Sequence, residues 1–235
     1  GMALKGWLQW GSNWVKQAMP GYCAFCLAPA SAGQGWCATC LYELPWNLHA
    51  CRQCGDPVAH GTSLCGHCLV DPPAFSTTQA GLLYQGSIKQ LVHDFKFHAS
   101  PRAGTLLAEL MLLTPPIDLG NALLSVPMTT PHACTRGFNQ SHWLAEHLSR
   151  QLGIPMVSAK RIKDSPSQRT LNRRQRAANL AGAFVFESPP PAHLLIIDDV
   201  VTTGSTGNAL GRAALEAGAK RVDIWAAART PLGKD

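Results

Sequence analysis

The sequence predicts an α/β protein whose parallel sheet follows a small cysteine-rich module. Beyond residue 80, apolar runs of strand length alternate with segments of helical periodicity, which is the pattern of a parallel α/β sheet. Before residue 70 the composition is loop-like, and eight of the nine cysteines fall within residues 23–68. With 235 residues, of which 46% are hydrophobic, the chain is long enough for one or two domains with a buried core.

Charge is sparse and concentrated in one segment. Charged residues make up 14% of the chain, against about 25% in an average domain. Residues 160–176 contain seven Lys or Arg and one acid, Asp164, and this surplus equals the net charge of +6 of the whole chain. The distribution excludes a generally basic, histone-like protein and indicates a local anion-binding segment.

The N-terminal residues 1–20 are predicted to form a short helix. Trp7, Leu8, Trp14 and Val15 recur at helical spacing, which favours a helix that packs on the body of the protein. The alternative is a helix that contacts a membrane surface or a partner. No run approaches 18 consecutive apolar residues, so no membrane span is expected. The start of the chain has no long apolar stretch of the signal-peptide kind, which favours a cytoplasmic protein.

Residues 21–70 contain a cysteine repeat and are predicted to form a double zinc-binding module. The unit Cys-x2-Cys-x10-Cys-x2-Cys occurs as a first repeat (residues 23–40) and a second repeat (residues 51–68). Its members are Cys23, Cys26, Cys37 and Cys40, then Cys51, Cys54, Cys65 and Cys68. Four thiolates complete a tetrahedral zinc site, and in a reducing compartment paired cysteines more often bind metal than form disulfides. Because protein atoms fill all four positions, both zinc ions are expected to be structural.

The spacing leaves the partition of the eight ligands open. Either each repeat holds its own ion, or the sites interleave, with Cys23, Cys26, Cys51 and Cys54 in one site and the other four in the second. We favour the sequential partition because each repeat is self-sufficient. Structural zinc supplies on the order of 10–16 kcal/mol of folding free energy, enough to hold a segment this poor in core residues.

The elements of the predicted sheet follow a predicted linker over residues 71–79. Apolar residues at helical spacing predict a helix around residues 88–95, and a second around residues 106–111 that ends before Pro115 and Pro116. Further helices are predicted over residues 139–152 and 205–217. The predicted strands cover residues 122–126, 183–186, 194–197 and 221–226.

Two acids and a loop of small residues come directly after the apolar run 194–197. The acids are Asp198 and Asp199; two valines follow, and then Thr202, Thr203, Gly204, Ser205 and Thr206 at the start of a helix. Ligands of open α/β sheets bind at the carboxyl ends of the strands. The backbone N–H groups of such a loop suit a phosphate, whereas two acids would repel it and suit ribose hydroxyls or a metal. Phosphate and diol recognition side by side indicate a phosphorylated sugar.

This stretch resembles the phosphoribosyl pyrophosphate (PRPP) signature of type I phosphoribosyltransferases. The resemblance implies that residues 80–235 form a Rossmann-like phosphoribosyltransferase domain. It implies that Thr202, Thr203, Gly204, Ser205 and Thr206 hold the 5′-phosphate. Asp198 and Asp199 would hold the ribose hydroxyls or favour the oxocarbenium ion, with magnesium bridging the pyrophosphate and the ribose hydroxyls.

Further motifs make the chain similar to the ComF/GntX family, which is linked to natural competence and DNA uptake. They are the N-terminal CxxC finger, Tyr84-x-Gly86, Lys96, Arg136-Gly-Phe-Asn139-Gln140, Gln168, Leu171, Arg176, Asn179 and Ala183-Phe184. Ser125-Val126-Pro127 ends a strand where the pyrophosphate loop of type I enzymes lies, and the basic stretch 160–176 stands where they place a loop that closes over the substrate. Candidates for binding pyrophosphate charge, and so for a catalytic role, are Arg136, Arg161 and Arg169.

The resemblance implies a protein that binds PRPP or a related phosphosugar and transfers phosphoribosyl to an amine or base acceptor that the sequence does not identify. The alternative is a non-catalytic protein of the same fold that binds single-stranded DNA or proteins of the competence machinery during transformation. The basic stretch suits both, because single-stranded DNA also requires a positive groove. Residues 160–176 contain no aromatic residue for base stacking, which weakens the nucleic-acid interpretation of that stretch.

Overall fold

A computed structural model describes residues 21–30, 34–128, 138–163 and 180–232. The predicted helix over residues 1–20, Arg136, Arg169 and most of the basic stretch lie outside the described residues. The chain forms two compact units, Gly1–Pro45 and Trp46–Asp235. The boundary between them falls between the first and the second cysteine repeat.

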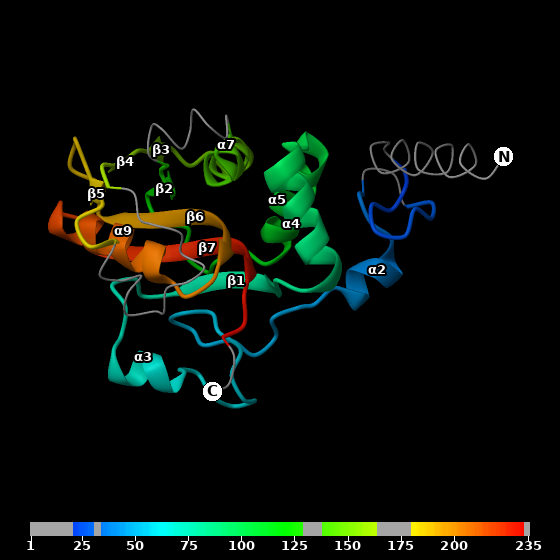
Figure 1. Cartoon of the computed structure of the whole chain (residues 1–235), viewed down its shortest axis with the longest axis horizontal. Coiled ribbons are helices and arrows are strands. Elements are labelled where there is room, and N and C mark those ends of the chain that lie inside the picture. The colour runs from blue at the N-terminus through cyan, green and yellow to red at the C-terminus, as the bar shows by residue number, and fades with distance from the viewer. Residues whose placement is uncertain (1–20, 31–33, 129–137, 164–179, 233–235) are drawn as a thin grey trace. The chain divides into compact units, whose positions relative to one another are not determined.

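A parallel sheet lies at the centre of the unit Trp46–Asp235 (Figure 1). Within the described residues it has five strands in the order β1-β7-β6-β2-β3, and all neighbours pair in parallel. The strands are β1 (Thr78–Leu83), β2 (Ala122–Ser125), β3 (Met156–Val157), β6 (His193–Val201) and β7 (Arg221–Arg229). The predicted parallel α/β architecture is confirmed. The central strands are apolar and mostly buried, as parallel strands covered on both faces require.

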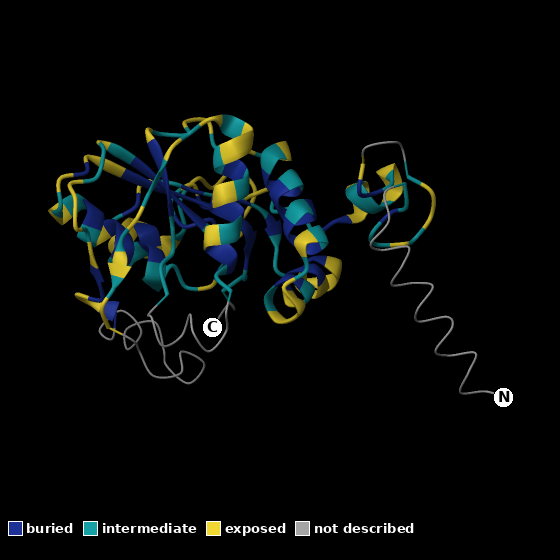
Figure 2. Cartoon of the chain, turned by 90° about the horizontal axis from the view of Figure 1, so that it is seen from above, coloured by how far each residue is buried: buried dark blue, intermediate teal, exposed yellow. Residues whose placement is uncertain are grey.

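The helices beside the sheet are α4 (Gly86–His98), α5 (Pro101–Leu113), α7 (Gln140–Leu152) and α9 (Ser205–Glu216). The apolar positions that predicted α4 and α5 are all buried, and buried residues concentrate along the strands (Figure 2). Local chemistry sets the helix ends: Ser100 caps α5, Asn139 caps α7, and Gly153 ends α7 with a left-handed φ of 68°. None of the helices in the described part of the chain is both long and apolar enough to cross a membrane.

The strand order reverses between β2 and β6. From β2 the chain runs through α7 outward to β3, and from β6 it runs through α9 outward to β7. Because parallel crossovers are right-handed, these two helices cover opposite faces of the sheet. The pairing of β2 with β6 ends at Ser125 and Ile197, whereas β6 continues beside β7 as far as Val201. Open α/β sheets bind ligands at such a reversal of the strand order, outside the carboxyl ends of the strands.

The linker predicted over residues 71–79 is wrong. β1 begins at Thr78, and the side chain of Phe75 is buried. A Cβ added to Gly204 would lie 3.3 Å from the Phe75 ring, and one added to Gly207 would lie 3.7 Å from it. Two prolines and several small polar residues give the segment the composition of a linker. Its single aromatic side chain nevertheless packs in the core against Gly204 and, beside Ile224, against Gly207.

Two predicted strands also differ from the structure. The strand predicted over residues 183–186 is reduced to β5 (Phe184–Val185), which pairs antiparallel with β4 (Lys160–Arg161) outside the main sheet. The strand predicted over residues 194–197 continues through both acids, because β7 supplies pairing partners up to the register of Val201 with Arg229. Asp198 and Asp199 therefore lie within β6 and not after it.

The second cysteine repeat is part of the core of the unit Trp46–Asp235. Cys51, Cys54 and Cys68 belong to the same buried apolar cluster as Phe75 and the strands of the sheet. The short helix α3 (Gly66–Val70) lies in this repeat. The first repeat lies in the other unit, together with the short helix α2 (Ala38–Glu43).

Candidate functional site

The eight predicted metal ligands form two clusters, and in each the four sulfur atoms lie within 4.8 Å of one another. The clusters are Cys23, Cys26, Cys37 and Cys40, and Cys51, Cys54, Cys65 and Cys68. The ligands are thus grouped repeat by repeat, as in the sequential partition. The sulfur atoms of Cys26 and Cys37 are 3.7 Å apart, as are those of Cys54 and Cys65. A tetrahedron with Zn–S bonds of about 2.3 Å has an edge of about 3.8 Å, so the spacing fits zinc.

Each cluster also includes the start of a short helix. Cys37 is the N-cap of α2 and Cys65 is the N-cap of α3. Each of these sulfur atoms accepts a hydrogen bond, at 3.4 Å, from the backbone N–H three residues further on. The same sulfur atom therefore caps a helix and faces the metal position.

The pKa values of two thiols in the second repeat are shifted in a way that favours binding of a cation. Burial raises the pKa of Cys51, but hydrogen bonds from backbone N–H groups, that of Cys54 foremost, outweigh this and lower the pKa to about 7. Burial, and next the neighbouring Cys54, raise the pKa of Cys68. One thiol thus ionises readily while ionisation of another is opposed. A divalent cation removes that opposition, because metal ligation requires thiolates.

The two acids of β6 lie just beyond its pairing with β2, and Asp198 lines a small pocket together with residues of loop 202–206. The Oδ1 atom of Asp198 accepts hydrogen bonds from the Ser141 hydroxyl at 3.0 Å and from the Asp199 backbone N–H at 2.8 Å. Burial raises the pKa of Asp198 well above its usual range, and the adjacent Asp199 carboxylate raises it further, while the Ser141 hydrogen bond acts against both. Such a carboxylate pair is stabilised by a cation or by hydroxyl donors.

Loop 202–206 brings the start of α9 to the same end of the sheet. Gly204 is the N-cap with a left-handed φ of 82°, and as a glycine it has no side chain that could cap the helix. The Thr203 Oγ1 atom lies 2.8 Å from the Ser205 hydroxyl and accepts a hydrogen bond from the Ser205 N–H at 3.3 Å. The first turn of α9 contains no acidic residue. Its N–H groups and the helix dipole therefore suit a phosphate.

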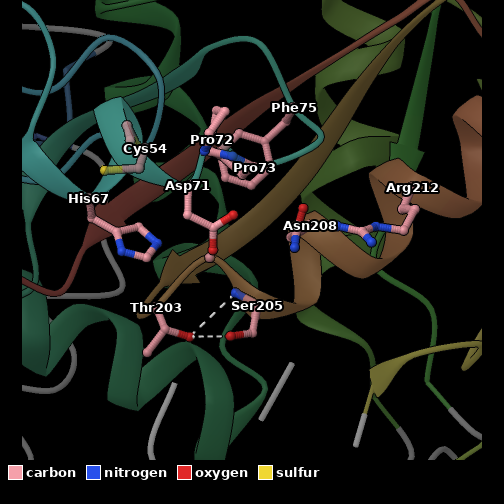
Figure 3. A pocket seen from close by; sticks show the side chains of 12 residues that line it. Cys54, His67, Asp71, Pro72, Pro73, Phe75, Thr203, Ser205, Asn208 and Arg212 are labelled. Carbon is pink, nitrogen blue, oxygen red and sulfur yellow. Dashed lines mark hydrogen bonds between the residues drawn. The ribbon is translucent and has the colours of Figure 1, made fainter. Parts of the chain in front are cut away.

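A cavity of about 450 Å³ opens beside loop 202–206 (Figure 3). One side is formed by the loop and α9, through Thr203, Gly204, Ser205, Asn208 and Arg212. The other is formed by the second repeat and the segment after it, through Cys54, His67, Cys68, Asp71, Pro72, Pro73 and Phe75. In Figure 3, His67 and Asp71 extend from the second repeat toward Thr203 and Ser205. The candidate phosphate loop and the second metal cluster thus share one cavity.

Comparisons with known proteins identify the family of this chain. A model described as a double zinc ribbon domain matches residues 14–69, and one described as a phosphoribosyl transferase domain matches residues 139–234. The chain is 34% identical over 223 residues to DNA utilization protein YhgH of Shigella flexneri, covering 90% of this chain and 98% of that protein. The chain belongs to the ComF family. Its fold class is confirmed as a phosphoribosyltransferase-like parallel sheet with an N-terminal double zinc ribbon.

Two more distant relatives carry competence names. Identity to Competence protein F of Haemophilus influenzae is 29% over 211 residues, which covers 84% of this ComF-family chain and 92% of that protein. Identity to Competence protein ComFC of Bacillus subtilis is 25% over 185 residues, which covers 72% of this chain and 73% of that protein. The chain therefore corresponds to most of the length of each of these relatives.

The structure brings only part of the predicted site of this ComF-family chain together. Asp198, Asp199 and loop 202–206 lie along one continuous segment at the end of the sheet. Arg161 lies in β4, where its Nε donates to the Lys163 carbonyl at 3.2 Å and its guanidinium lies 5.6 Å from the centre of the Phe184 ring. Neither contact involves the acids or the loop. Arg136 and Arg169 lie outside the described residues.

Asn139 joins the two ends of the predicted pyrophosphate loop. Its Nδ2 donates to the Val126 carbonyl, just beyond β2, at 3.1 Å. Its Oδ1 accepts from the His142 N–H at 3.1 Å and so caps α7. One side chain of the Arg136–Gln140 motif therefore fixes where the chain leaves β2 and where it enters α7.

Sequence reasoning missed two residues of this region. Ser141, on the first turn of α7, donates to Asp198; it directly follows the motif 136–140 and could have been considered with it. Arg229 ends β7 and is fully buried. A charged residue at the end of an apolar strand is the signal that directed attention to Asp198, and the same signal was available at Arg229.

Proposed function

We propose that this protein binds PRPP, or a closely related phosphosugar, together with magnesium at the end of β6. The observation that carries the proposal is the carboxylate pair Asp198 and Asp199 next to a helix start whose N-cap, Gly204, has no side chain. In this proposal the 5′-phosphate binds to backbone N–H groups and hydroxyls of loop 202–206. The acids accept hydrogen bonds from the ribose hydroxyls. The relation to a phosphoribosyl transferase domain over residues 139–234 supports this assignment.

The proposed reaction is phosphoribosyl transfer. The bond between ribose C1 and the pyrophosphate oxygen breaks, pyrophosphate leaves with the electron pair, and an acceptor nitrogen bonds to C1 and loses its proton. Positive charge that develops on the ribose is stabilised by Asp198 and Asp199. When bound, magnesium supplies charge neutralisation for the leaving pyrophosphate, and the two acids, beside the ribose hydroxyls, are the residues that hold it.

We assign the pyrophosphate charge to Arg136, Arg161 and Arg169, because arginine makes bidentate phosphate contacts. Residues 164–176 of the basic stretch lie outside the described residues, and their role in closing over the substrate stays a prediction. The proposed organisation is a helix over residues 1–20, a double zinc-binding module over residues 21–70 and the phosphoribosyltransferase-like domain over residues 80–235. The cytoplasm is the proposed location, because it keeps thiolate ligands reduced.

Calorimetric titration of the full chain with PRPP, with and without Mg²⁺, tests the binding. We expect magnesium-dependent heat from the wild type and a loss of affinity of at least about tenfold, or about 1.4 kcal/mol, when Asp198→Asn and Asp199→Asn are combined. Asp118→Asn is the matched control, since Asp118 contacts His193 at the opposite end of β6. A wild type that gives no heat with PRPP contradicts the proposal. A screen of amine and base acceptors for PRPP consumption then identifies the second substrate.

A second candidate function is binding of single-stranded DNA during DNA uptake. Relatives are named for DNA utilization and competence, and residues 160–176 hold a charge surplus equal to the chain's net charge. Binding through this stretch would depend on phosphate charge and be strongly salt-dependent. Fluorescence anisotropy with a labelled oligonucleotide tests this: neutral substitutions at Arg173, Arg174 and Arg176 should weaken binding and flatten its salt dependence. Binding unchanged by these substitutions argues against a nucleic-acid role for the stretch.

A further inference from the structure

Arg229 connects the second metal cluster with loop 202–206. Its side chain is fully buried at the end of β7. The Nε atom donates to the carbonyl of the metal ligand Cys54 at 2.9 Å. The Nη1 atom donates to the carbonyl of Thr202, the first residue of the loop, and to that of Thr230 at 2.6 Å. One rigid guanidinium therefore spans the backbone of the metal cluster and the backbone of the loop.

The charge of Arg229 lacks a carboxylate partner. None of the ion pairs among the described residues includes it, and its Nη2 atom has no hydrogen-bond partner there. A buried cation without a compensating charge is costly to keep in the folded state. A zinc ion with four thiolates carries a net negative charge, and the second repeat places such a centre beside Arg229.

The second repeat is itself fixed to the sheet. The Thr78 N–H donates to the Arg52 carbonyl at 3.0 Å, and the Thr78 hydroxyl donates to the Gln53 carbonyl at 2.7 Å. These bonds hold the turn 51–54 against the start of β1. Unlike these contacts, Arg229 continues from the turn to loop 202–206. Loss or binding of the metal at the second repeat can therefore affect loop 202–206 directly, through the side chain of Arg229.

We propose that Arg229 is a positioning residue that couples zinc at the second repeat to the conformation of loop 202–206. With zinc bound, the negatively charged cluster attracts the guanidinium and fixes its position. The guanidinium then donates to the Thr202 carbonyl, and this hydrogen bond sets the orientation of the N–H groups of the loop. Loss of this zinc removes the counter-charge and loosens the loop. The ligands of the first repeat belong to the other unit, Gly1–Pro45. That the loop binds a phosphosugar rests on the function proposed above. The coupling between zinc at the second repeat and the conformation of the loop does not depend on it.

Hydrogen–deuterium exchange of the full chain tests the coupling without a ligand. Arg229→Lys keeps the charge but replaces the fork that reaches Cys54 and Thr202, so exchange of amides 203–208 should accelerate about tenfold. Thr78→Val is the matched control, because it removes a hydrogen bond to the second repeat that does not lead to the loop; it should change these amides by less than about twofold. Amides 194–197 of β6 serve as the reference for an intact sheet and should not change in either variant.

Zinc release tests the coupling from the side of the metal. With a chromogenic chelator, Arg229→Lys should release one of its zinc ions about tenfold faster than the wild type, as expected when a residue that supports a metal ligand is lost. The other ion should leave at the wild-type rate. Cys54→Ser should accelerate exchange of amides 203–208, whereas Cys26→Ser, which removes a ligand of the first repeat, should not.

Ribose 5-phosphate separates this inference from the proposed function. If it orders loop 202–206, reciprocity requires that it raise the zinc affinity of the second repeat in the wild type and not in Arg229→Lys. If it has no effect while Arg229→Lys accelerates exchange and zinc release, the coupling stands and the phosphosugar site is wrong. If Arg229→Lys leaves either the exchange of amides 203–208 or the zinc release at the wild-type value, the coupling is overturned. Equal effects of Cys26→Ser and Cys54→Ser on the loop overturn it as well.

Discussion

The two cysteine repeats have the same spacing but different surroundings. In both, the four sulfur atoms lie within 4.8 Å of one another, and the third cysteine caps a short helix. In the first repeat Cys23 is buried and Cys26 is exposed, whereas in the second Cys51, Cys54 and Cys68 are buried in the apolar cluster of the sheet. The spacing of the cysteines thus determines the geometry of each metal cluster. The residues packed around a cluster determine which part of the protein the metal stabilises.

This difference assigns the two zinc ions different tasks. In the unit Gly1–Pro45 the large buried side chains among the described residues are Trp36 and Leu44, so the metal must provide much of the cohesion of that unit. In the unit Trp46–Asp235 the second repeat covers part of a sheet that already has an extensive core. The zinc of the second repeat therefore adds to an existing apolar core. The zinc of the first repeat stabilises a unit that has little apolar core.

The largest expected effect comes from removing the equivalent ligand in each repeat. Structural zinc contributes about 10–16 kcal/mol, which is comparable to the whole stability of a domain, about 5–15 kcal/mol. Because the sheet has an extensive core of its own, Cys51→Ser should lower the zinc content and shift the cooperative thermal transition of the unit Trp46–Asp235 to a lower temperature. Cys23→Ser should lower the zinc content equally and leave that transition in place. Metal analysis with differential scanning calorimetry measures both, and identical thermal traces for the two variants would refute the comparison.

A smaller effect is expected from one aromatic residue near each repeat. Phe75 is buried between the second repeat and α9, whereas the Tyr42 side chain, on α2 of the first repeat, is 87% exposed. Phe75→Ala should reduce the unfolding free energy by about 3–5 kcal/mol. Tyr42→Ala should change it by less than about 0.5 kcal/mol. Chemical denaturation measures both; a Phe75→Ala cost below about 1 kcal/mol would show that the segment 71–77 is a linker after all.

The smallest effect concerns the charge of Asp198, in the same unit as the second repeat. Its raised pKa means that ionisation disfavours the folded state, so this contribution to stability is present at low pH and is lost as pH rises through the raised pKa. Asp198→Asn keeps an acceptor for Ser141, so it should be neutral below about pH 4. Near pH 7 it should raise the unfolding free energy by about 1 kcal/mol and the thermal midpoint by about 2–4 °C.

Asp118→Asn is the control of opposite sign. A hydrogen bond from the Gly120 N–H lowers the pKa of Asp118, so this acid favours the folded state above its ordinary pKa and loses that effect on acidification. The control should therefore not stabilise the protein near pH 7. Thermal unfolding as a function of pH measures both variants. An Asp198→Asn midpoint that rises equally at all pH values would contradict the charge argument.

Features set by neighbouring residues in the chain were predictable from the sequence. The eight metal ligands follow from local spacing, although their division into two clusters does not, and α7 follows from its apolar stripe between Asn139 and Gly153. The acids and loop 202–206 form one continuous segment, so their proximity was also predictable. These features need no knowledge of how distant segments pack.

Features set by distant segments were not predictable. The segment 71–79 reads as a linker until Gly204 and Gly207 provide the space for Phe75. The two repeats are indistinguishable by spacing, and the second is placed in the core by Thr78 and Arg229. Each of these contacts joins residues far apart in the sequence, and periodicity carries no information about them.

The helix α3 has only five residues, too few to persist in water without support. It begins at Cys65, a metal ligand, and ends at Asp71, which with His67 forms one wall of the cavity beside loop 202–206. That wall is consequently assembled by the ion. A zinc-starved cell would produce a chain with the residues of loop 202–206 intact in sequence but one wall of the cavity beside them missing. Metal supply would then decide how much of the chain is ready to receive a ligand, independently of how much of it is synthesised.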